Sequence, residues 1–293
     1  MTIEPLSELR RVTVNGLDIA YFEQGEGPLA LCLHGYPDTA YTWHRLLPEL
    51  AAAGYRAIAP FNRGYAPTGF PADGQYPGSA LGVDANALHE VLGGDENAVL
   101  IGHDWGAIGT YVAAGLGPER WRRVVALSIP PGAVAAQGYL VYEYLKLSWY
   151  IFFQLNPLSE MVIPMNDYEY IRKLCRDWSP GFDATELIER FVESMATPEH
   201  LTAALNYYRY TMPGGPPSPD HDHATAMIFQ LPTQPLLYLH GRDDGCMSSE
   251  LAAGTGDHLT GESRFEMIEE AGHFLHLEQP ELANRLIVDF LAG

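Results

Sequence analysis

One short stretch limits most strongly what this chain can fold into. An apolar run, residues 98–101, leads into Gly102-His103-Asp104-Trp105-Gly106, and small and apolar residues then indicate a helix over 107–114. A continuous apolar run is typical of a strand buried on both faces. The flanking glycines permit a strained turn, which lifts its central side chain at the end of the strand, beside a helix N-terminus. The stretch predicts an α/β protein with Asp104 as a nucleophile at the sheet edge.

The first half of the chain repeats this alternation of strands and helices. Asn15-Gly16, between two alternating runs, predicts a β-hairpin with a primed turn. Further apolar runs predict buried strands, and the segments between them predict helices. The strands are expected at 29–33, 55–59 and 123–128, and the helices at 42–53 and 79–92. Alternation of this kind predicts a mostly parallel sheet flanked by helices on both faces.

The pattern changes between Pro130 and Pro232. This part has no convincing buried strand, and its aromatic-rich segments predict helices at about 138–153, 167–175, 185–195 and 198–210. Alternation then resumes with strands at 235–240 and 264–268, a helix near 249–258 between them, and a last helix that begins at Pro280. The sequence therefore predicts a core domain built from residues 1–129 and 233–293, with residues 130–232 inserted as a helical cap.

Charge and cysteine content narrow the partners and the compartment. A net charge of −20 argues against binding to nucleic acid or to anionic membranes. Three cysteines (Cys32, Cys175 and Cys246) without motif spacing argue against disulfides and a metal site. The first residues lack a signal-peptide pattern, and no apolar run has the length of a bilayer span. We therefore expect a cytoplasmic protein.

Three positions in this sequence follow strands directly, at the sheet edge where open α/β sheets bind ligands. They are Asp104, the pair Asp243-Asp244 and His273. The order nucleophile, acid, histidine is that of the α/β-hydrolase arrangement, in which the histidine is a base and the acid orients its ring. Asp244 is favoured as the acid, and Asp243 remains the alternative. Local roles such as a helix N-cap or a solvated turn are the simpler alternatives.

Such a nucleophile needs backbone donors for the negative charge that develops on its carbonyl oxygen. The residue after the nucleophile, Trp105, is one expected donor. The other is expected in the loop His34-Gly35-Tyr36-Pro37 after the 29–33 strand, where Tyr36 is the candidate. Only the backbone N–H groups of these two residues are needed for this oxyanion hole.

Along nearly its whole length the sequence resembles the α/β-hydrolase-fold epoxide hydrolases. His34-Gly35-Tyr36-Pro37, continued by Trp43, is similar to the HGxP loop of that family. Arg63-Gly64-Tyr65 is similar to its glycine-bearing loop after the next strand, and the stretch 102–106 to its nucleophile motif. These motifs occur here in the order and spacing of the family.

The resemblance also implies two tyrosines in the cap that bind the epoxide oxygen. Asn206-Tyr207-Tyr208-Arg209 matches one motif and offers Tyr208. The segment 148–154 offers Tyr150, although Trp149 occupies the family's register before Gln154. Packing within the cap is the simpler role for either tyrosine. The substrate is expected to contact Trp105, Tyr150, Tyr208 and Phe152.

The resemblance implies hydrolysis of an epoxide to a vicinal diol through an ester on Asp104. Tyr208 and Tyr150 would donate to the epoxide oxygen, and His273, oriented by Asp244, would activate water. No metal or organic cofactor is expected. The expected partners are a small hydrophobic epoxide and water, and the protein is expected to be a monomer or a homodimer.

Two other functions are compatible with these residues. A haloalkane dehalogenase shares the aspartate nucleophile, and the Trp105 indole N–H could bind halide. Those enzymes, however, usually carry Asn where this chain has Tyr36. The other alternative is a ligand-binding protein that keeps the hydrolase scaffold without turnover.

Overall fold

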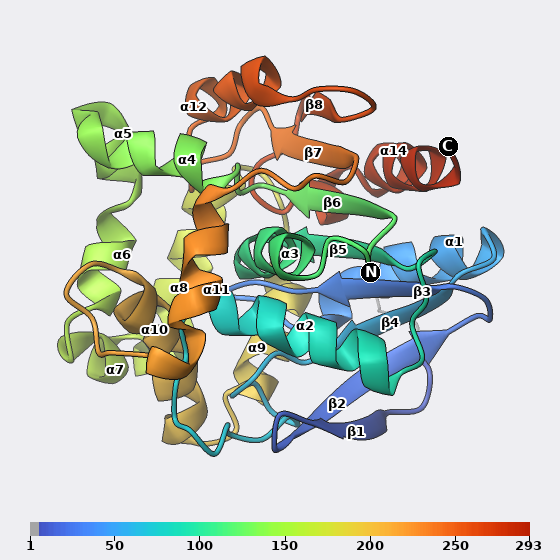
Figure 1. Ribbon diagram of the computed structural model, residues 1–293. Helices are drawn as coiled ribbons and strands as arrows, with labels where there is room; N and C mark the ends of the chain where they lie inside the picture. The colour runs from blue at the N-terminus through green and yellow to red at the C-terminus, as the bar shows by residue number, and fades with distance from the viewer. Residues whose placement is uncertain (1–5) are drawn as a thin grey trace.

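The computed structural model describes residues 6–293. The first five residues, on which the expectation of no signal peptide rests, lie outside the described part. Eight strands form one sheet in the order β1-β2-β4-β3-β5-β6-β7-β8 (Figure 1). β2 pairs antiparallel with β1 and β4, and the other neighbours are parallel. The prediction of a mostly parallel sheet flanked by helices is confirmed.

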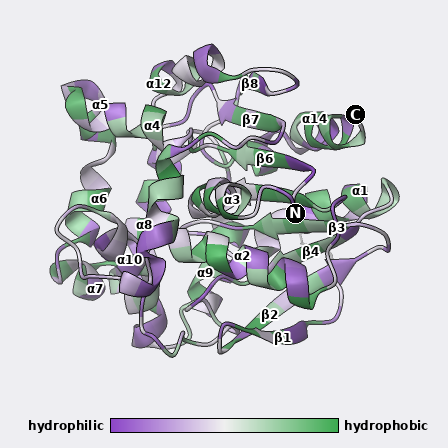
Figure 2. Ribbon diagram, in the orientation of Figure 1, coloured by the Kyte–Doolittle hydropathy of each residue, from purple (hydrophilic) through white to green (hydrophobic). Residues whose placement is uncertain are grey.

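Every predicted strand is present. Their bounds are β1 Arg10–Val14, β2 Leu17–Gln24, β3 Leu29–Leu33, β4 Arg56–Pro60, β5 Val99–His103, β6 Arg123–Leu127, β7 Leu236–Gly241 and β8 Arg264–Ile268. Asn15 and Gly16 join β1 to β2 with φ of 52° and 71°, the positive values that a type I′ turn requires. β3, β5 and β6 are buried along their whole length, and Figure 2 shows the central strands as largely hydrophobic.

Helices cover both faces of this sheet. α2 (Ser79–Val91) and α3 (Trp105–Leu116) lie on the face toward the viewer in Figure 1. α1 (Leu46–Ala52) and α14 (Pro280–Ala292) pack on the opposite face. Side chains alternate along β5, so that Val99 and Ile101 join one apolar core and Leu100 the other.

Several short helices complete the core domain. The segment expected to be one helix at 42–53 begins as a 3₁₀ turn, η1 (Ala40–Arg45), before α1. The helix expected near 249–258 is α12 (Ser249–Ala253) followed by η5 (Gly254–His258). One short helix, α13 (Leu275–Glu278), was not predicted.

The chain between β6 and β7 is a helical insertion, as predicted. Its elements are α4 Gly132–Ala135, η2 Ala136–Leu140, α5 Tyr142–Leu147, α6 Trp149–Gln154, α7 Leu158–Val162, α8 Met165–Trp178, α9 Thr185–Ser194, α10 Pro198–Thr211, η3 Pro219–His221, α11 Asp222–Thr225 and η4 Ala226–Phe229. The single helix expected over 138–153 is wrong, because extended backbone at Val141 (φ −118°, ψ 123°) separates η2 from α5, and Ser148 ends α5. No helix of residues 6–293 has the length and apolar composition to cross a membrane.

A buried ion pair fastens the loop after β4 to α2. Arg63 Nε and Nη2 donate to the two carboxylate oxygens of Asp84 at 2.8 and 2.7 Å, and both side chains are at most 5% exposed. Asn15 Nδ2 of the β1–β2 turn donates to the same carboxylate at 2.9 Å. Paired hydrogen bonds of this kind compensate the cost of removing both charges from water. The pair therefore links three segments that are distant in the sequence.

We expect Asp84→Ala to lower the free energy of unfolding by about 3–5 kcal/mol, because the Arg63 charge stays buried without its partner. Unfolding in urea, followed by circular dichroism, measures this. Asp18→Ala is the matched control: its partner Arg11 is about half exposed, so the loss should stay below about 1 kcal/mol. Equal losses in the two variants would show that burial of the Arg63–Asp84 pair does not matter.

Candidate active site

The turn between β5 and α3 holds Asp104 in a strained conformation. Asp104 has φ 52° and ψ −117° and is 4% exposed. Positive φ is costly for a residue with a side chain and persists only where the surroundings impose it. A Cβ on Gly102 would lie 2.1 Å from the Gly106 carbonyl oxygen, and one on Gly106 would lie 2.1 Å from that of Leu33. Glycine is therefore required on both sides of Asp104.

The loop after β3 lies against the Asp104 carboxylate. β3 and β5 are neighbours in the sheet, with Leu33 opposite Gly102. The backbone N–H of Tyr36 donates to Asp104 Oδ1 at 2.7 Å. A Cβ on Gly35 would lie 2.4 Å from the same oxygen, so only glycine allows this approach. The predicted backbone donor at Tyr36 thus points at the predicted nucleophile.

His273 lies between two carboxylates. Its Nδ1 bonds Asp244 Oδ2 at 3.0 Å, and its Nε2 is 3.7 Å from Asp104 Oδ2. Asp243 is exposed, so the structure places Asp244 and not Asp243 against the histidine. Asp244 Oδ1 accepts the backbone N–H groups of Cys246 and Met247 at 2.7 and 3.0 Å. Loops that follow β5, β7 and β8 thus bring together one nucleophile, one acid and one histidine.

Asp104, His273 and Asp244 each favour the charged form of their neighbour. Burial on its own would lower the pKa of His273, but the carboxylates of Asp244 and Asp104 raise that pKa well above its usual range. Burial would likewise raise the pKa of Asp244, but His273 and the buried His240 lower it. The arrangement therefore favours an ionised Asp244 and a protonated His273 while Asp104 carries its negative charge.

Two tyrosines from the cap reach this group. Tyr150 of α6 and Tyr208 of α10 are 5% and 2% exposed, and their rings meet edge to face at 5.9 Å. The Tyr208 ring also packs against Trp105, the first residue of α3, at 4.9 Å. Burial, with a further contribution from the Asp104 charge, raises the pKa of both tyrosines well above the usual range. Their hydroxyls are therefore protonated donors.

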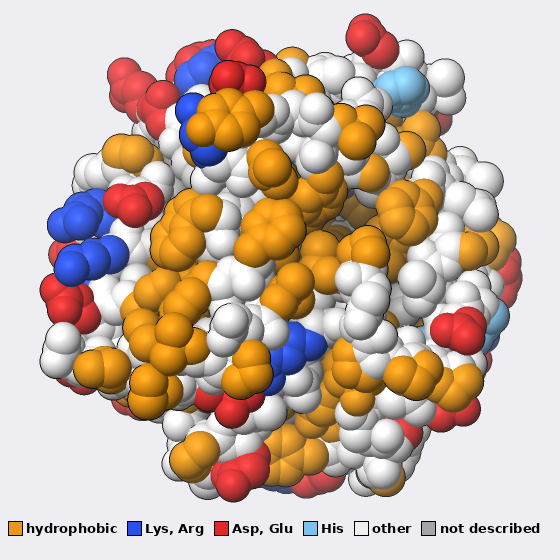
Figure 3. Space-filling view, turned by 90° about the vertical axis from the view of Figure 1, so that its left-hand side faces the viewer, with side chains coloured by type: hydrophobic (Ala, Val, Ile, Leu, Met, Phe, Trp, Pro, Cys, Tyr) orange, Lys and Arg blue, Asp and Glu red, His pale blue; other side chains and the backbone are white. Residues whose placement is uncertain are grey.

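Of the two candidates in α6, the structure turns Tyr150 inward and leaves Trp149 49% exposed. The same helix corrects the expectation for Phe152. Successive residues on a helix are about 100° apart, so Phe152 lies on nearly the opposite side from Tyr150. It is 52% exposed on the surface of the cap, where Figure 3 shows hydrophobic side chains gathered, and it does not share the buried position of Tyr150.

A second buried polar cluster lies beside His273 and was missed in the sequence. Asp38 Oδ2 is 3.8 Å from His103 Nδ1, His103 Nε2 bonds the His273 carbonyl oxygen at 3.0 Å, and His276 Nε2 bonds Thr42 Oγ1 at 2.6 Å. Burial raises the pKa of Asp38 to about 7 and lowers that of His103 to about 3. No local signal in the sequence indicates that these residues meet.

This cluster is one of two in residues 6–293 whose side chains could hold a metal ion, the other being Asp244, Cys246 and His273. One ligand atom each of Asp38, His103 and His276 lies within 4.8 Å of the others. Two imidazoles and one carboxylate are donors that transition metals bind.

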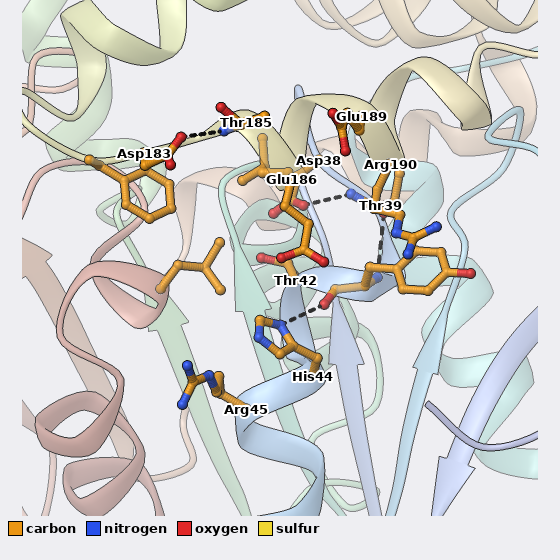
Figure 4. A pocket seen from close by; sticks show the side chains of 14 residues that line it. Asp38, Thr39, Thr42, His44, Arg45, Asp183, Thr185, Glu186, Glu189 and Arg190 are labelled. Carbon is orange, nitrogen blue, oxygen red and sulfur yellow. Dashed lines mark hydrogen bonds between the residues drawn. The ribbon is translucent and has the colours of Figure 1, made fainter. Parts of the chain in front are cut away.

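A pocket of about 530 Å³ opens beside Asp38, at the seam between η1 and α9 (Figure 4). Thr42 lines its core side, while Glu186, Glu189 and Arg190 line its cap side. The lining mixes these polar and charged side chains with apolar ones such as Phe182, Leu187 and Leu277, and it includes neither Asp104 nor His273. Because Asp38 borders both the pocket and the buried cluster, the pocket approaches the candidate active site from the side of the loop after β3.

A family model described as "Alpha/beta hydrolase family" matches residues 30–286. The chain belongs to this family. It is 30% identical over 292 residues to epoxide hydrolase 4 of Homo sapiens, covering 96% of this chain and 77% of that protein. It is 30% identical to the AB hydrolase superfamily protein YfhM of Bacillus subtilis, covering 96% of both. Epoxide hydrolase A of Mycobacterium thermoresistibile is similar in structure, with a TM-score of 0.77, 26% identity and 98% coverage of both chains. The chain is an alpha/beta hydrolase related to epoxide hydrolases.

The buried carboxyl group of Asp38 predicts a pH-dependent stability for this hydrolase. Folding raises the pKa of Asp38 from an ordinary 3.8 to about 7, so between these values the folded protein keeps a proton that the unfolded chain has lost. The free energy of unfolding therefore falls as the pH rises through this window. We expect Asp38→Asn to be more stable than the wild type above pH 7, by roughly 2–4 kcal/mol.

The difference between the two proteins should shrink below pH 7 and vanish near pH 4, about the pKa of an exposed aspartate. Urea unfolding at a series of pH values measures it. Asn keeps an oxygen for the Thr39 N–H that donates to Asp38 Oδ1 at 2.7 Å, so the loop retains that bond. A stability difference that is constant with pH would contradict this account of Asp38.

Proposed function

We propose that this hydrolase opens a small apolar epoxide to a vicinal diol through a covalent ester on Asp104. The observation that carries the proposal is the environment of one carboxylate: Asp104 Oδ1 accepts the Tyr36 N–H, and Oδ2 faces His273. The buried Tyr208 ring packs on Trp105, the residue after Asp104, and the Tyr150 ring packs on Tyr208. The full-length relationship to epoxide hydrolases supports the same reaction.

In the first half-reaction Asp104 Oδ2 attacks an epoxide carbon, and the bond from that carbon to the ring oxygen breaks. The alkoxide that forms takes a proton from Tyr150 or Tyr208, whose raised pKa values keep both hydroxyls protonated beforehand. The Tyr36 N–H stays on Oδ1, which becomes the carbonyl oxygen of the ester. The product of this step is a hydroxyalkyl ester of Asp104.

Formation of the ester changes the charge next to His273. The ionised Asp104 is one of the groups that raise the pKa of His273, and the ester carries no such charge. The pKa of His273 therefore falls, and its proton passes through solvent to the tyrosinate that the first step left. The neutral ring can then act as a base with Asp244 holding its orientation. One carboxylate thus serves as the nucleophile and also controls when the base is ready.

In the second half-reaction His273 takes a proton from water, and the hydroxide attacks the ester carbonyl carbon of Asp104. Negative charge develops on Oδ1, where the Tyr36 N–H already donates. We expect the Trp105 N–H to be the second donor. The ester bond breaks, the leaving diol oxygen takes the proton of the added hydroxyl group, and Asp104 returns to its carboxylate. The proton that His273 took from water restores its resting charge, so the cycle consumes one epoxide and one water.

The walls around Asp104 suggest the substrate class. Besides the two tyrosines they include the rings of Trp105, Tyr36 and Trp178, all at most 5% exposed. The Tyr36 ring packs edge to face on Tyr208 at 5.6 Å. Buried aromatic walls favour an apolar substrate, and we propose an alkyl- or aryl-substituted epoxide.

Trapping the ester tests the covalent mechanism. In His273→Gln the base is removed but the nucleophile is intact, so we expect the ester to accumulate to about one per protein chain. Intact-protein mass spectrometry should show an increase equal to the mass of the whole epoxide. Asp104→Asn is the control and should show none.

The mass also separates the two chemistries, because a haloalkane would add its mass less that of the hydrogen halide. An unchanged mass in His273→Gln across a panel of aryl and alkyl epoxides would refute the mechanism and leave the ligand-binding alternative.

Removing one hydroxyl from the cap tests the acid step. We expect Tyr208→Phe to slow diol formation by about 10²-fold, since the alkoxide loses a positioned donor. Tyr210→Phe is the matched control, because Tyr210 lies two residues beyond Tyr208 in α10 and its hydroxyl donates to the Gly74 carbonyl oxygen. Diol formation and halide release are measured in parallel on both proteins. Halide release from haloalkanes without turnover of any epoxide would identify a dehalogenase instead.

A further inference from the structure

Cys246 takes no part in the proposed reaction steps, although its sulfur lies in the candidate active site. It is a free thiol, 2% exposed, in the loop after β7, two residues beyond Asp244. Its Sγ is 3.3 Å from Tyr150 Oη, within hydrogen-bond distance for sulfur. It also lies within 4.8 Å of a carboxylate oxygen of Asp244 and a ring nitrogen of His273. A core residue therefore touches the hydroxyl of a cap tyrosine beside the catalytic group.

The backbone holds this thiol firmly. The N–H of Cys246 donates to Asp244 Oδ1 at 2.7 Å, so the acid that orients His273 also orients Cys246. The preceding Gly245 donates to the Trp178 carbonyl oxygen at 3.1 Å, and a Cβ there would lie 2.0 Å from the Asp177 carbonyl oxygen. The position of Cys246 is thus set by Asp244 and by the end of α8 in the cap, and not by its contact with Tyr150.

The ring and the hydroxyl of Tyr150 have separate supports. Trp178 packs edge to face on Tyr150 at 4.7 Å and on His273 at 5.0 Å, which places the tyrosine ring relative to the base. Cys246 then contacts the oxygen at the end of that ring. The hydroxyl of Tyr208, by contrast, has no acceptor within residues 6–293. The two tyrosines are therefore not equivalent.

We propose that Cys246 is a positioning residue that directs the Tyr150 hydroxyl toward the epoxide oxygen. The proposal rests on the proposed function. Burial keeps the thiol protonated by raising its pKa. It can therefore donate its S–H to Tyr150 Oη while the tyrosine O–H points to the substrate. Sulfur is also a weak acceptor, so the tyrosine proton is given up readily to the alkoxide, a charged and stronger acceptor.

A double-mutant cycle tests this role. We expect Cys246→Ala to slow ester formation, measured by rapid quench in a single turnover, about fivefold, the effect of losing one modest hydrogen bond. Cys246→Ser keeps a donor and acceptor at the same position and should stay within about twofold of the wild type. In the Tyr150→Phe background, Cys246→Ala should change nothing further, because the hydroxyl on which it acts is gone.

Cys32→Ala is the matched control: Cys32 is equally buried in β3 and belongs to none of the groups above, so its truncation should leave the rate of ester formation unchanged. A readout without catalysis is the infrared S–H stretching band, assigned to Cys246 by its loss in Cys246→Ala. That band should shift in Tyr150→Phe and stay in place in Tyr208→Phe.

Equal fivefold losses from Cys246→Ala with and without the Tyr150 hydroxyl would overturn the proposal, since they would report packing alone. An S–H band unmoved by Tyr150→Phe would overturn it as well. If the ester forms but Cys246→Ala and Tyr150→Phe have independent effects on its rate, only the role of Cys246 is refuted. A wild-type protein that forms no ester from any epoxide refutes the proposed function itself.

Discussion

The close approach of two strand ends is the constraint on which the rest of this active site depends. β3 and β5 lie side by side, and the loop after β3 contacts the turn after β5. The two segments approach so closely that only glycine fits at Gly35, Gly102 and Gly106. This contact holds Asp104 at positive φ, at a cost of about 1–3 kcal/mol. The same contact places the Tyr36 N–H on the carboxylate, so the strain and the oxyanion donor have one structural origin.

A buried carboxylate is stable only where its charge is matched, and here the matching is shared. His273 lies between Asp104 and Asp244, and His240 Nε2 lies 3.6 Å from Asp244 Oδ2, the oxygen that His273 also faces. In the proposed reaction, formation of the ester removes one negative charge from this chain of groups and converts His273 from an acid to a base. The electrostatic balance of the resting protein thereby sets the order of the two half-reactions.

Two neighbouring residues of α10, Tyr207 and Tyr208, contact the core with different roles. In α10 the Tyr207 hydroxyl donates to the Arg63 carbonyl oxygen at 2.9 Å and anchors the cap to the loop after β4. Tyr208, the next residue, turns toward Trp105 and the nucleophile. Arg63 is itself held by the buried Asp84. The position of the proposed acid therefore depends on the buried Arg63–Asp84 ion pair as well as on its own contacts.

Local patterns in the sequence determined the sheet, the hairpin at Asn15-Gly16 and the helical insertion, because strand, turn and helix signals extend over only a few residues. They also singled out Asp104, since glycine spacing reports backbone strain. Only the tertiary structure decided between Asp244 and Asp243, turned Tyr150 inward, moved Phe152 outward and joined Cys246 to a tyrosine in the cap. These outcomes depend on how loops after separate strands and two cap helices pack together, and contacts between residues so distant in the chain leave no periodic pattern in the sequence.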